Sequence, residues 1–272
     1  MLVPVWVFIG IEGASIYSRR AARRADVGRA TVIGFLGVWL LLVLVSLLSM
    51  GVLSQAELAG LPNPSMAYVL RAIVGEWGAT VIIVGSIISV LGALLAWVLL
   101  CAEVLYAAAG DGTMPAFLGR ENARGVPTNA LWLSNGLIQL FLLLVLVNSG
   151  SYTGLVLLAA SMSLVPYFLS TAFGVQLAWR GDAYAGEPGV RWRDYAVALL
   201  ASAYALWLVY AGGLDNLLLS VLLYVPGVVV FALTRLQRGE QVFTRWEWVL
   251  FGAILVVAIA TLVAFSRGEL AL

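Results

Sequence analysis

Apolar residues are grouped into eight long segments along the chain, separated by stretches that contain the charged residues. The segments cover approximately residues 1–17, 31–53, 79–109, 129–148, 153–178, 195–212, 216–234 and 246–266. An α-helix needs roughly 20 apolar residues to cross a bilayer, and these segments are close to that length or longer. The stretches between them are rich in arginine, glycine and proline, as expected of turns outside the membrane. The pattern predicts eight helical membrane spans.

The first apolar segment is interrupted where Gly10 and Gly13 flank Glu12. A glycine weakens a helix by roughly 1 kcal/mol relative to alanine, so two glycines this close together predict a break. A carboxylate at membrane depth is costly and usually marks a route for a substrate or an ion. Many secondary transporters place their binding site at a broken helix near the middle of the bilayer. Residues 6–14 are therefore the first candidate for a transport site.

The composition supports a polytopic membrane protein. Apolar residues make up 62% of the chain and charged residues 11%, and the mean hydropathy is +1.02. Cys101 is the single cysteine and histidine is absent, which excludes a disulfide framework and a Cys/His metal site within the chain. We therefore predict no metal and no cofactor.

Arginine supplies all 15 basic residues, and its distribution predicts the topology. If the eight spans alternate in direction, 13 arginines fall on one side of the membrane and only Arg71 and Arg267 on the other. The positive-inside rule places the arginine-rich loops in the cytoplasm, with the chain in the plasma membrane. The basic cluster at 18–24 is interpreted as a topology determinant and not as a nucleic-acid site. Both chain ends then face outward, which suggests further spans upstream of residue 1.

Other unusual positions lie inside the predicted spans. Trp97 lies mid-membrane, away from the interfacial belts, which suits either core filling or a flat face for a cationic ligand. Glu103 is expected to reach toward the arginine-rich loops or to join a gating pair, and structural pairing is the favoured interpretation. Pro166 must release a backbone carbonyl and kink its helix, which places Tyr167 at the kink with a hypothetical gating role.

Several motifs, in order, resemble those of the amino acid–polyamine–organocation transporters. Residues 5–14 (VWVFIGIEGA) resemble the sixth transmembrane helix of that family. Residues 107–117 (AAAGDGTMPAF) resemble its alanine-rich helix end followed by a D-G-x-x-P element, and residues 125–127 (GVP) match the downstream G-x-P. Residues 164–167 (LVPY) look like its helix ten. The first motif and the arginine-rich loop after it are most similar to the arginine/ornithine antiporter branch.

The resemblance implies an all-α membrane protein with about eight transmembrane helices. They would form the second half of a five-plus-five inverted-repeat (LeuT-like) transporter, followed by accessory helices. Residues 1–178 would be the second repeat, family helices six to ten, with the broken helix near 9–14. Residues 195–266 would be accessory transmembrane helices. The first repeat, with its own broken helix, is expected outside this chain.

The resemblance also assigns roles to individual residues. In the family, the amino and carboxylate groups of the ligand contact exposed backbone of two broken helices. The implied substrate-binding residues are Trp6, Ile9, Gly10 and Trp97. Glu12 and Tyr167 would act in gating or charge coupling, and Trp97 would pack over the aliphatic or guanidinium part of the substrate.

The leading hypothesis is the C-terminal portion of an antiporter that exchanges arginine for ornithine by alternating access. Its partners would be a basic amino acid and the lipid bilayer; a homodimer and an assembly with a separate N-terminal half are both open alternatives. Another amino acid or polyamine pair is also open. The alternative of a different class is a truncated or split-gene membrane fragment without transport activity of its own. A membrane enzyme is disfavoured because histidine is absent and no cluster of catalytic side chains stands out.

Overall fold

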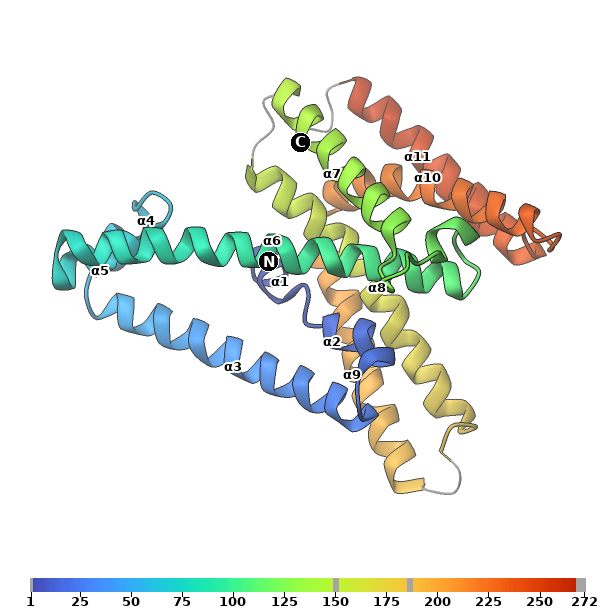
Figure 1. Ribbon diagram of the computed structural model, residues 1–272, viewed down its shortest axis with the longest axis horizontal. Helices are drawn as coiled ribbons and strands as arrows, with labels where there is room; N and C mark the ends of the chain where they lie inside the picture. Colours follow the sequence, from blue (N-terminus) through green and yellow to red (C-terminus); the bar gives the residue numbers. More distant parts are fainter. Residues whose placement is uncertain (1, 149–151, 185–187, 268–272) are drawn as a thin grey trace. The chain divides into compact units, whose positions relative to one another are not determined.

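The computed structural model describes residues 2–148, 152–184 and 188–267, and every regular element within them is helical (Figure 1). The long helices are α3 (Arg24–Met50), α6 (Glu76–Gly110), α7 (Thr128–Asn148), α8 (Tyr152–Arg180), α9 (Pro188–Ala211), α10 (Leu214–Gln237) and α11 (Arg245–Ser266). The prediction of an all-α membrane protein is confirmed.

Six of these helices carry an apolar stretch long enough to cross a membrane, namely α3, α6, α8, α9, α10 and α11. Each of them overlaps one predicted span. The two other predicted spans correspond to α7, which has 21 residues, and to an interrupted segment made of α1 (Leu2–Phe8) and α2 (Gly13–Ile16). The most apolar stretches of α3 and α6 have no buried residue, so their apolar side chains are available to lipid or to neighbouring helices. The chain is a multi-pass membrane protein.

Two helices begin about seven residues before the apolar pattern predicts. The helix α3 starts at Arg24, and α9 starts at Pro188. Proline suits the first position of a helix, because its fixed φ is helical and its missing N–H would have no partner there. The first turns of both helices contain arginine, so a criterion based on apolar residues alone leaves them out.

The segment between α3 and α6, predicted to be a loop, contains two short helices, α4 (Gln55–Ala59) and α5 (Ser65–Val74). A capping box begins α4: the Glu57 N–H donates to Ser54 Oγ at 3.4 Å, and the Ser54 N–H donates to the Glu57 carboxylate at 2.8 Å. The helix α5 packs against α6 and buries Ala67 and Val69. This segment is therefore ordered by helix capping and packing.

The chain forms two compact units. The first comprises Met1–Ile9, Asp111–Ala116 and Gln139–Leu272, and the second comprises Gly10–Gly110 and Phe117–Ile138. One boundary between the units therefore falls inside the interrupted first helix.

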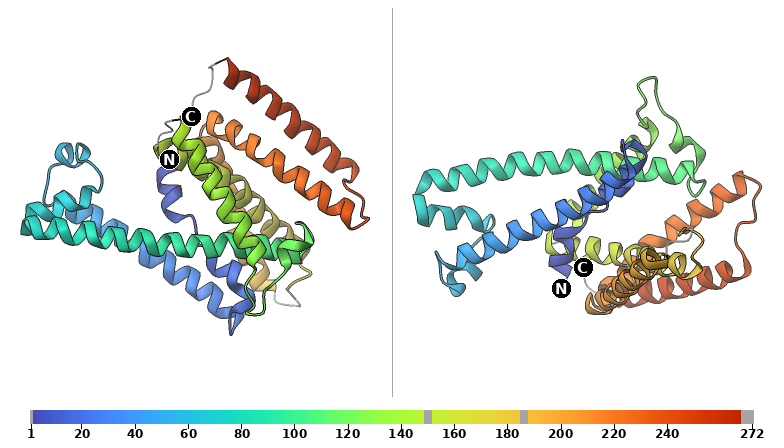
Figure 2. Two further views of the ribbon diagram at one scale, coloured as in Figure 1. Left: turned by 45° about the horizontal axis from the view of Figure 1, so that its top comes forward. Right: turned by 90° about the horizontal axis from the view of Figure 1, so that it is seen from below.

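In the first unit α8 is the central helix, because it packs against α1, α9 and α10. Leu2 of α1 and Ala160 and Leu164 of α8 form a buried apolar cluster. The helices α10 and α11 pack as an antiparallel pair and lie side by side in both views of Figure 2.

The helix α8 continues through Pro166. Proline has no N–H, so the carbonyl of Met162, four residues earlier, loses its helical donor. The hydroxyl of Tyr224 on α10 donates to this carbonyl with an O···O distance of 2.6 Å. A residue from a later helix thus satisfies the carbonyl that Pro166 was predicted to release.

In the second unit, α6 extends over 35 residues, or about 52 Å at 1.5 Å per residue, which exceeds the roughly 30 Å of a bilayer core. The helix α5 packs along α6, and α2 contacts both α3 and α6. This arrangement places the end of the interrupted helix next to the longest span.

Candidate functional site

The interruption of the first helix is built around Gly10. The helix α1 ends at Phe8 and α2 begins at Gly13. Gly10 has a φ of +103°, a conformation that residues with a β-carbon rarely adopt. Its N–H donates to Glu12 Oε2 at 2.9 Å. The Glu12 carboxylate therefore satisfies a backbone donor at the break, a role that the sequence did not predict.

Trp97 of α6 lies directly against this break. A β-carbon built on Gly10 would be 3.0 Å from Trp97 Cζ2 and 3.4 Å from Cη2, which is closer than ordinary van der Waals contact. The indole can approach the backbone this closely because residue 10 has no side chain. Trp97 is 39% exposed, so part of its surface is free for a further contact. The structure thus brings Gly10, Glu12 and Trp97 together.

The contact between the two segments continues beyond Gly10. A β-carbon built on Gly13 would be 3.5 Å from Leu100 Cδ1. Positions 10 and 13 therefore face positions 97 and 100, with the same three-residue step on both segments. Tyr17, at the start of the 3₁₀ helix η1 (Tyr17–Arg20), lines a pocket together with Glu103. We call residues 10–17 and 97–103, taken together, the α2–α6 seam.

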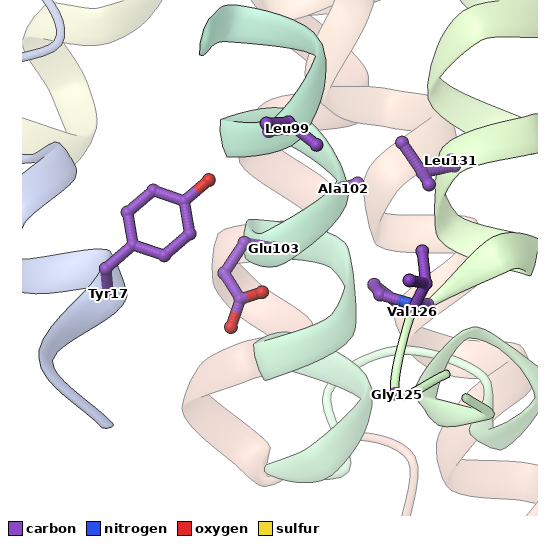
Figure 3. Close-up of a pocket in the computed structure, with 8 residues that line it drawn as sticks. Tyr17, Leu99, Ala102, Glu103, Gly125, Val126 and Leu131 are labelled. Carbon is purple, nitrogen blue, oxygen red and sulfur yellow. The ribbon is translucent and has the colours of Figure 1, made fainter. Parts of the chain in front are cut away.

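A pocket of about 190 Å³ lies at the Tyr17–Glu103 end of the α2–α6 seam (Figure 3). Its lining consists of Tyr17, Leu99, Ala102, Glu103, Gly125, Val126, Pro127 and Leu131. Glu103 is only 3% exposed although it bears a carboxyl group, and it is the only charged residue in this lining. Figure 3 shows the Tyr17 ring extending from η1 toward α6, with its hydroxyl on the same side of α6 as the Glu103 carboxyl group.

One wall of this pocket is the turn that contains the G-x-P motif. The Asn122 side-chain oxygen accepts hydrogen bonds from the N–H groups of Arg124 at 2.9 Å and Val126 at 3.0 Å. Gly125 takes a φ of +71°, which suits glycine. The motif therefore forms a turn held by side-chain-to-backbone hydrogen bonds next to a buried acid.

The remaining predicted site residues belong to the first unit. Trp6 on α1 is 38% exposed. Ile9 packs against the cluster of Leu2 and Leu164, and its N–H donates to the Val5 carbonyl at 3.2 Å. Tyr167 is partly buried on α8, directly after Pro166. The side chain of Ile9 therefore contributes to the α1–α8 core. The predicted site residues Gly10, Glu12 and Trp97 lie in the second unit.

The D-G-x-x-P element also lies in the first unit, at 111–115. Gly112 has a φ of +79°, and the guanidinium group of Arg238 lies against it so closely that a β-carbon would overlap the arginine. Arg238 Nη1 is also 3.7 Å from Glu240 Oε1. The positive φ therefore favours glycine in this motif, whereas the overlap involves only the far end of a flexible side chain that can move.

The arrangements that were not predicted from the sequence include the Tyr224–Met162 hydrogen bond and the pocket shared by Tyr17 and Glu103. Each joins residues more than 60 positions apart, so no local pattern signals it. Within the part of the chain that the structure describes, no group of three or more His, Cys, Asp or Glu side chains is placed to hold a metal ion.

Comparison with known proteins gives a consistent set of relatives. The sequence model of the amino acid permease family matches residues 1–229. The chain is 55% identical over 278 residues to an arginine/ornithine antiporter of Pseudomonas aeruginosa, covering 100% of the chain and 58% of that protein. It is 44% identical to an L-lysine transport protein of Corynebacterium glutamicum, covering 100% of the chain and 57% of that protein. It is 37% identical to an arginine/agmatine antiporter of Chlamydia trachomatis, covering 97% of the chain and 54% of that protein.

The chain thus spans between half and three-fifths of the length of these curated relatives. No solved structure matches it significantly.

Proposed function

Because the chain belongs to the amino acid permease family, we propose that it is part of an antiporter that exchanges basic amino acids, with arginine and ornithine as the pair. Exchange would occur across the plasma membrane, with the arginine-rich loops in the cytoplasm. The observation that carries the proposal is the contact between the Gly10 backbone and the Trp97 ring at the break of the first helix.

This contact suits the recognition of a cationic amino acid. Backbone groups in an unwound helix can bind the charged amino and carboxylate groups of a ligand at membrane depth. The partly exposed indole of Trp97 offers a flat face beside these groups. A guanidinium or ammonium group over such a face gains roughly 0.5–2 kcal/mol. Trp6 on α1 is proposed to complete the substrate contacts, and Ile9 to contribute through its backbone carbonyl.

Transport of this kind needs no catalytic side chain and no cofactor. Ligand binding near the middle of the bilayer would allow the protein to alternate between outward-open and inward-open states. The opposed gradients of the two amino acids would supply the energy. Glu12 and Tyr167 are proposed to respond to charge and to gate the site.

The relatives support a basic substrate but carry different names for the exchanged pair. One is named an arginine/ornithine antiporter, another an arginine/agmatine antiporter and a third an L-lysine transport protein. We favour the arginine/ornithine pair because the relative with that name shares 55% identity with the chain, compared with 44% and 37% for the other two.

Counterflow in proteoliposomes tests the proposal. The complete protein is reconstituted into vesicles loaded with ornithine, agmatine, lysine or buffer, and uptake of radiolabelled arginine is measured. We expect the fastest uptake with internal ornithine and little uptake with buffer. Agmatine-driven uptake without ornithine-driven uptake would reassign the pair, and a lack of exchange with every load would refute the antiporter assignment.

A pair of matched tryptophan variants on α6 tests the site. Trp97→Leu should raise the KM for arginine by roughly 2- to 30-fold, the range expected for the loss of a cation–π contact. Trp77→Leu is the control, because Trp77 lies in the first turn of the same helix and is 64% exposed. Equal effects of the two substitutions would argue against a ligand role for Trp97.

A further inference from the structure

We propose that the groove between α8, α10 and α11 binds one phospholipid molecule, with an acyl chain in the groove and the phosphate group at Arg235. Every residue that lines the groove belongs to the first unit, and none of them is a proposed substrate-binding residue. The ligand is a component of the bilayer, so the proposal does not depend on which amino acids are exchanged.

The groove is mostly apolar and is large enough for a ligand. Its volume is about 490 Å³, within the roughly 300–1,000 Å³ of typical small-molecule sites. Only Tyr224 and Glu247 bring polar side-chain groups to the lining. The Tyr224 hydroxyl donates to the Met162 carbonyl. A Glu247 carboxyl oxygen accepts the Thr244 N–H at 2.6 Å. Both polar groups therefore have partners within the protein, and the rest of the lining suits a hydrocarbon chain.

The shape of the groove comes from the packing of α10, which contacts both α8 and α11. Gly227 of α10 lines the groove, and a β-carbon built on it meets nothing within 4 Å. The missing side chain therefore leaves this space open. The Phe243 ring stacks on Phe251 with centroids 5.5 Å apart, and it lies 6.2 Å from the Phe231 ring. These ring contacts form one wall of the groove without a ligand.

The depth of the groove matches one leaflet of a bilayer. Along α10 the lining extends from Phe231 to Leu223, which is about 12 Å at 1.5 Å per residue. Along α11 it extends from Glu247 to Ile254, which is about 10 Å. Half of the hydrocarbon core of a bilayer is about 15 Å thick. A lipid tail from one leaflet fits this depth, whereas a further membrane-spanning helix would need a groove roughly twice as long.

The two ends of the groove differ in the way that a lipid requires. Tyr224 lines the deep end, and its hydrogen bond to the Met162 carbonyl joins α10 to α8 there. At the other end, Trp246 and Trp248 are 79% and 56% exposed in the first turn of α11. Exposed tryptophans at a helix end are typical of the boundary between the hydrocarbon core and the headgroups. The groove therefore begins at headgroup level and ends inside the hydrocarbon core.

Arg235 supplies a contact for the phosphate at the headgroup end. Its guanidinium carbon lies 4.9 Å from the centroid of the Phe231 ring, which lines the groove. Arg235 Nη1 donates to the Gln241 carbonyl at 3.1 Å, and Nε is 4.0 Å from Glu240 Oε2. These contacts hold the guanidinium group beside the groove. A guanidinium group is always charged and has five N–H donors, so it can also donate to a lipid phosphate.

This phosphate contact distinguishes the site from ordinary contact with the bilayer. The surrounding lipid is as apolar as the groove, so a tail gains little from the apolar lining alone. Retention of one lipid must therefore depend on the fit of the groove and on Arg235.

Photolabelling with a phospholipid that carries a diazirine in its acyl chain tests the site. The complete protein is reconstituted into nanodiscs with an increasing fraction of this lipid, and the labelled residues are identified by mass spectrometry. We expect labelling of the groove residues on α10 and α11 to saturate at a low fraction of the lipid. Labelling around Leu262, which is 55% exposed in the other half of α11, should rise in proportion to the fraction.

Two glycine variants test the fit of the tail. Gly227→Phe fills the groove and should reduce the saturable labelling several-fold. Gly252→Phe is the matched control, because a β-carbon on Gly252 of α11 also meets nothing within 4 Å and Gly252 does not line the groove. If Gly227→Phe does not fold, Gly227→Leu fills less of the groove and should reduce the labelling by a smaller factor.

A charge variant tests the phosphate contact. Arg235→Gln should weaken saturable labelling by the phospholipid about ten-fold, as expected for the loss of hydrogen bonds to a charged group. A diacylglycerol with the same diazirine tail has no phosphate, so its weaker labelling should not change in Arg235→Gln. Arg267→Gln is the control, since Arg267 is an exposed arginine at the other end of α11.

Each contrary result overturns the proposal. Labelling that does not saturate in the groove, or that is equal in Gly227→Phe and Gly252→Phe, leaves only ordinary contact with the bilayer. A lack of groove labelling in the complete protein would show that another protein segment covers the groove. Equal labelling by the phospholipid and the diacylglycerol would refute the phosphate contact at Arg235. None of these readouts uses amino acid exchange, so they can fail while the proposed function stands.

Discussion

The backbone of Gly10 and the indole of Trp97 lie close together, since a β-carbon built on residue 10 would be only 3.0 Å from the ring. The two residues are far apart in the sequence, and the packing of α2 on α6 brings them close together. The glycine therefore serves two purposes: it permits the φ of +103° that ends α1, and it lets an aromatic ring reach the peptide groups of the break.

Gly10→Ala should reduce both stability and exchange. The positive φ alone costs about 1–3 kcal/mol for a residue with a β-carbon, and contact with Trp97 adds to this. Thermal unfolding in detergent measures the first effect, and arginine counterflow measures the second. Gly92→Ala is the control, because a β-carbon there meets nothing within 4 Å in the interior of α6.

The steric and conformational costs at Gly10 can be separated. In a Trp97→Leu background the ring is absent, so Gly10→Ala should retain only the part of its cost that comes from φ. A double-mutant cycle of thermal stabilities measures the difference. If the cost of Gly10→Ala is the same with and without the indole, the contact with Trp97 contributes nothing to it.

Glu12→Ala and Glu12→Gln should differ in stability. The carboxylate accepts the Gly10 N–H at 2.9 Å, and glutamine retains an acceptor oxygen whereas alanine does not. Leaving this donor unsatisfied should cost about 1–3 kcal/mol in the alanine variant. Glu12→Gln should remain folded but lose exchange if the charge of Glu12 is required. Equal destabilisation in the two variants would instead show that the charge itself holds the turn.

Tyr224→Phe should destabilise the first unit by about 1–3 kcal/mol, because it leaves the Met162 carbonyl without a donor. In a Pro166→Ala background this carbonyl regains a helical N–H, so Tyr224→Phe should cost much less. Tyr210→Phe is the control, since Tyr210 is 86% exposed. Additive effects of the substitutions at 224 and 166 on thermal stability would argue against this explanation.

The capping box of α4 predicts a pH effect outside the membrane spans. The Ser54 hydroxyl donates to the Glu57 carboxylate at 2.6 Å and the Ser54 N–H donates at 2.8 Å, and these hydrogen bonds lower the pKa of Glu57. The ionised carboxylate therefore stabilises α4 above its ordinary pKa, and this contribution is lost as the pH falls through the lowered value.

The carboxyl ¹³C shift of Glu57 in a selectively labelled sample measures this titration. Ser54→Ala removes the hydroxyl group that donates to the Glu57 carboxylate, so it should move the pKa of Glu57 upward. A titration that does not change in Ser54→Ala would contradict the assignment.

The helical spans could largely be predicted because a bilayer demands about 20 consecutive apolar residues, and a run of that length can be recognised directly in the sequence. The starts of α3 and α9 were predicted less accurately, because the first turns of these helices carry arginines and lie outside the apolar run. The helix α5 was missed because its 10 residues are too few for a span. Its order comes from packing against α6, which no local pattern reports.

The candidate site was predictable only where the chemistry is local. The break at Gly10 follows from the backbone preference of glycine, and Glu12 is near enough in the sequence to bond to it. The approach of Trp97 to Gly10 depends on how α2 packs on α6, as does the position of Glu103 next to Tyr17. The mid-membrane position of Trp97 and the resemblance to a known family both indicated Trp97, but the pocket at Glu103 is visible only in the structure.

The hydrogen bond from Tyr224 to Met162 has a consequence for how the protein can be shortened. The helices after residue 195 were predicted to be accessory, which would suggest that a minimal transporter could end near Arg180. Such a truncation would remove the donor for a carbonyl within α8, and it would also remove the helices α9 and α10 that pack on α8. The helix α10 therefore completes the hydrogen bonding of α8 in an environment where water cannot do so.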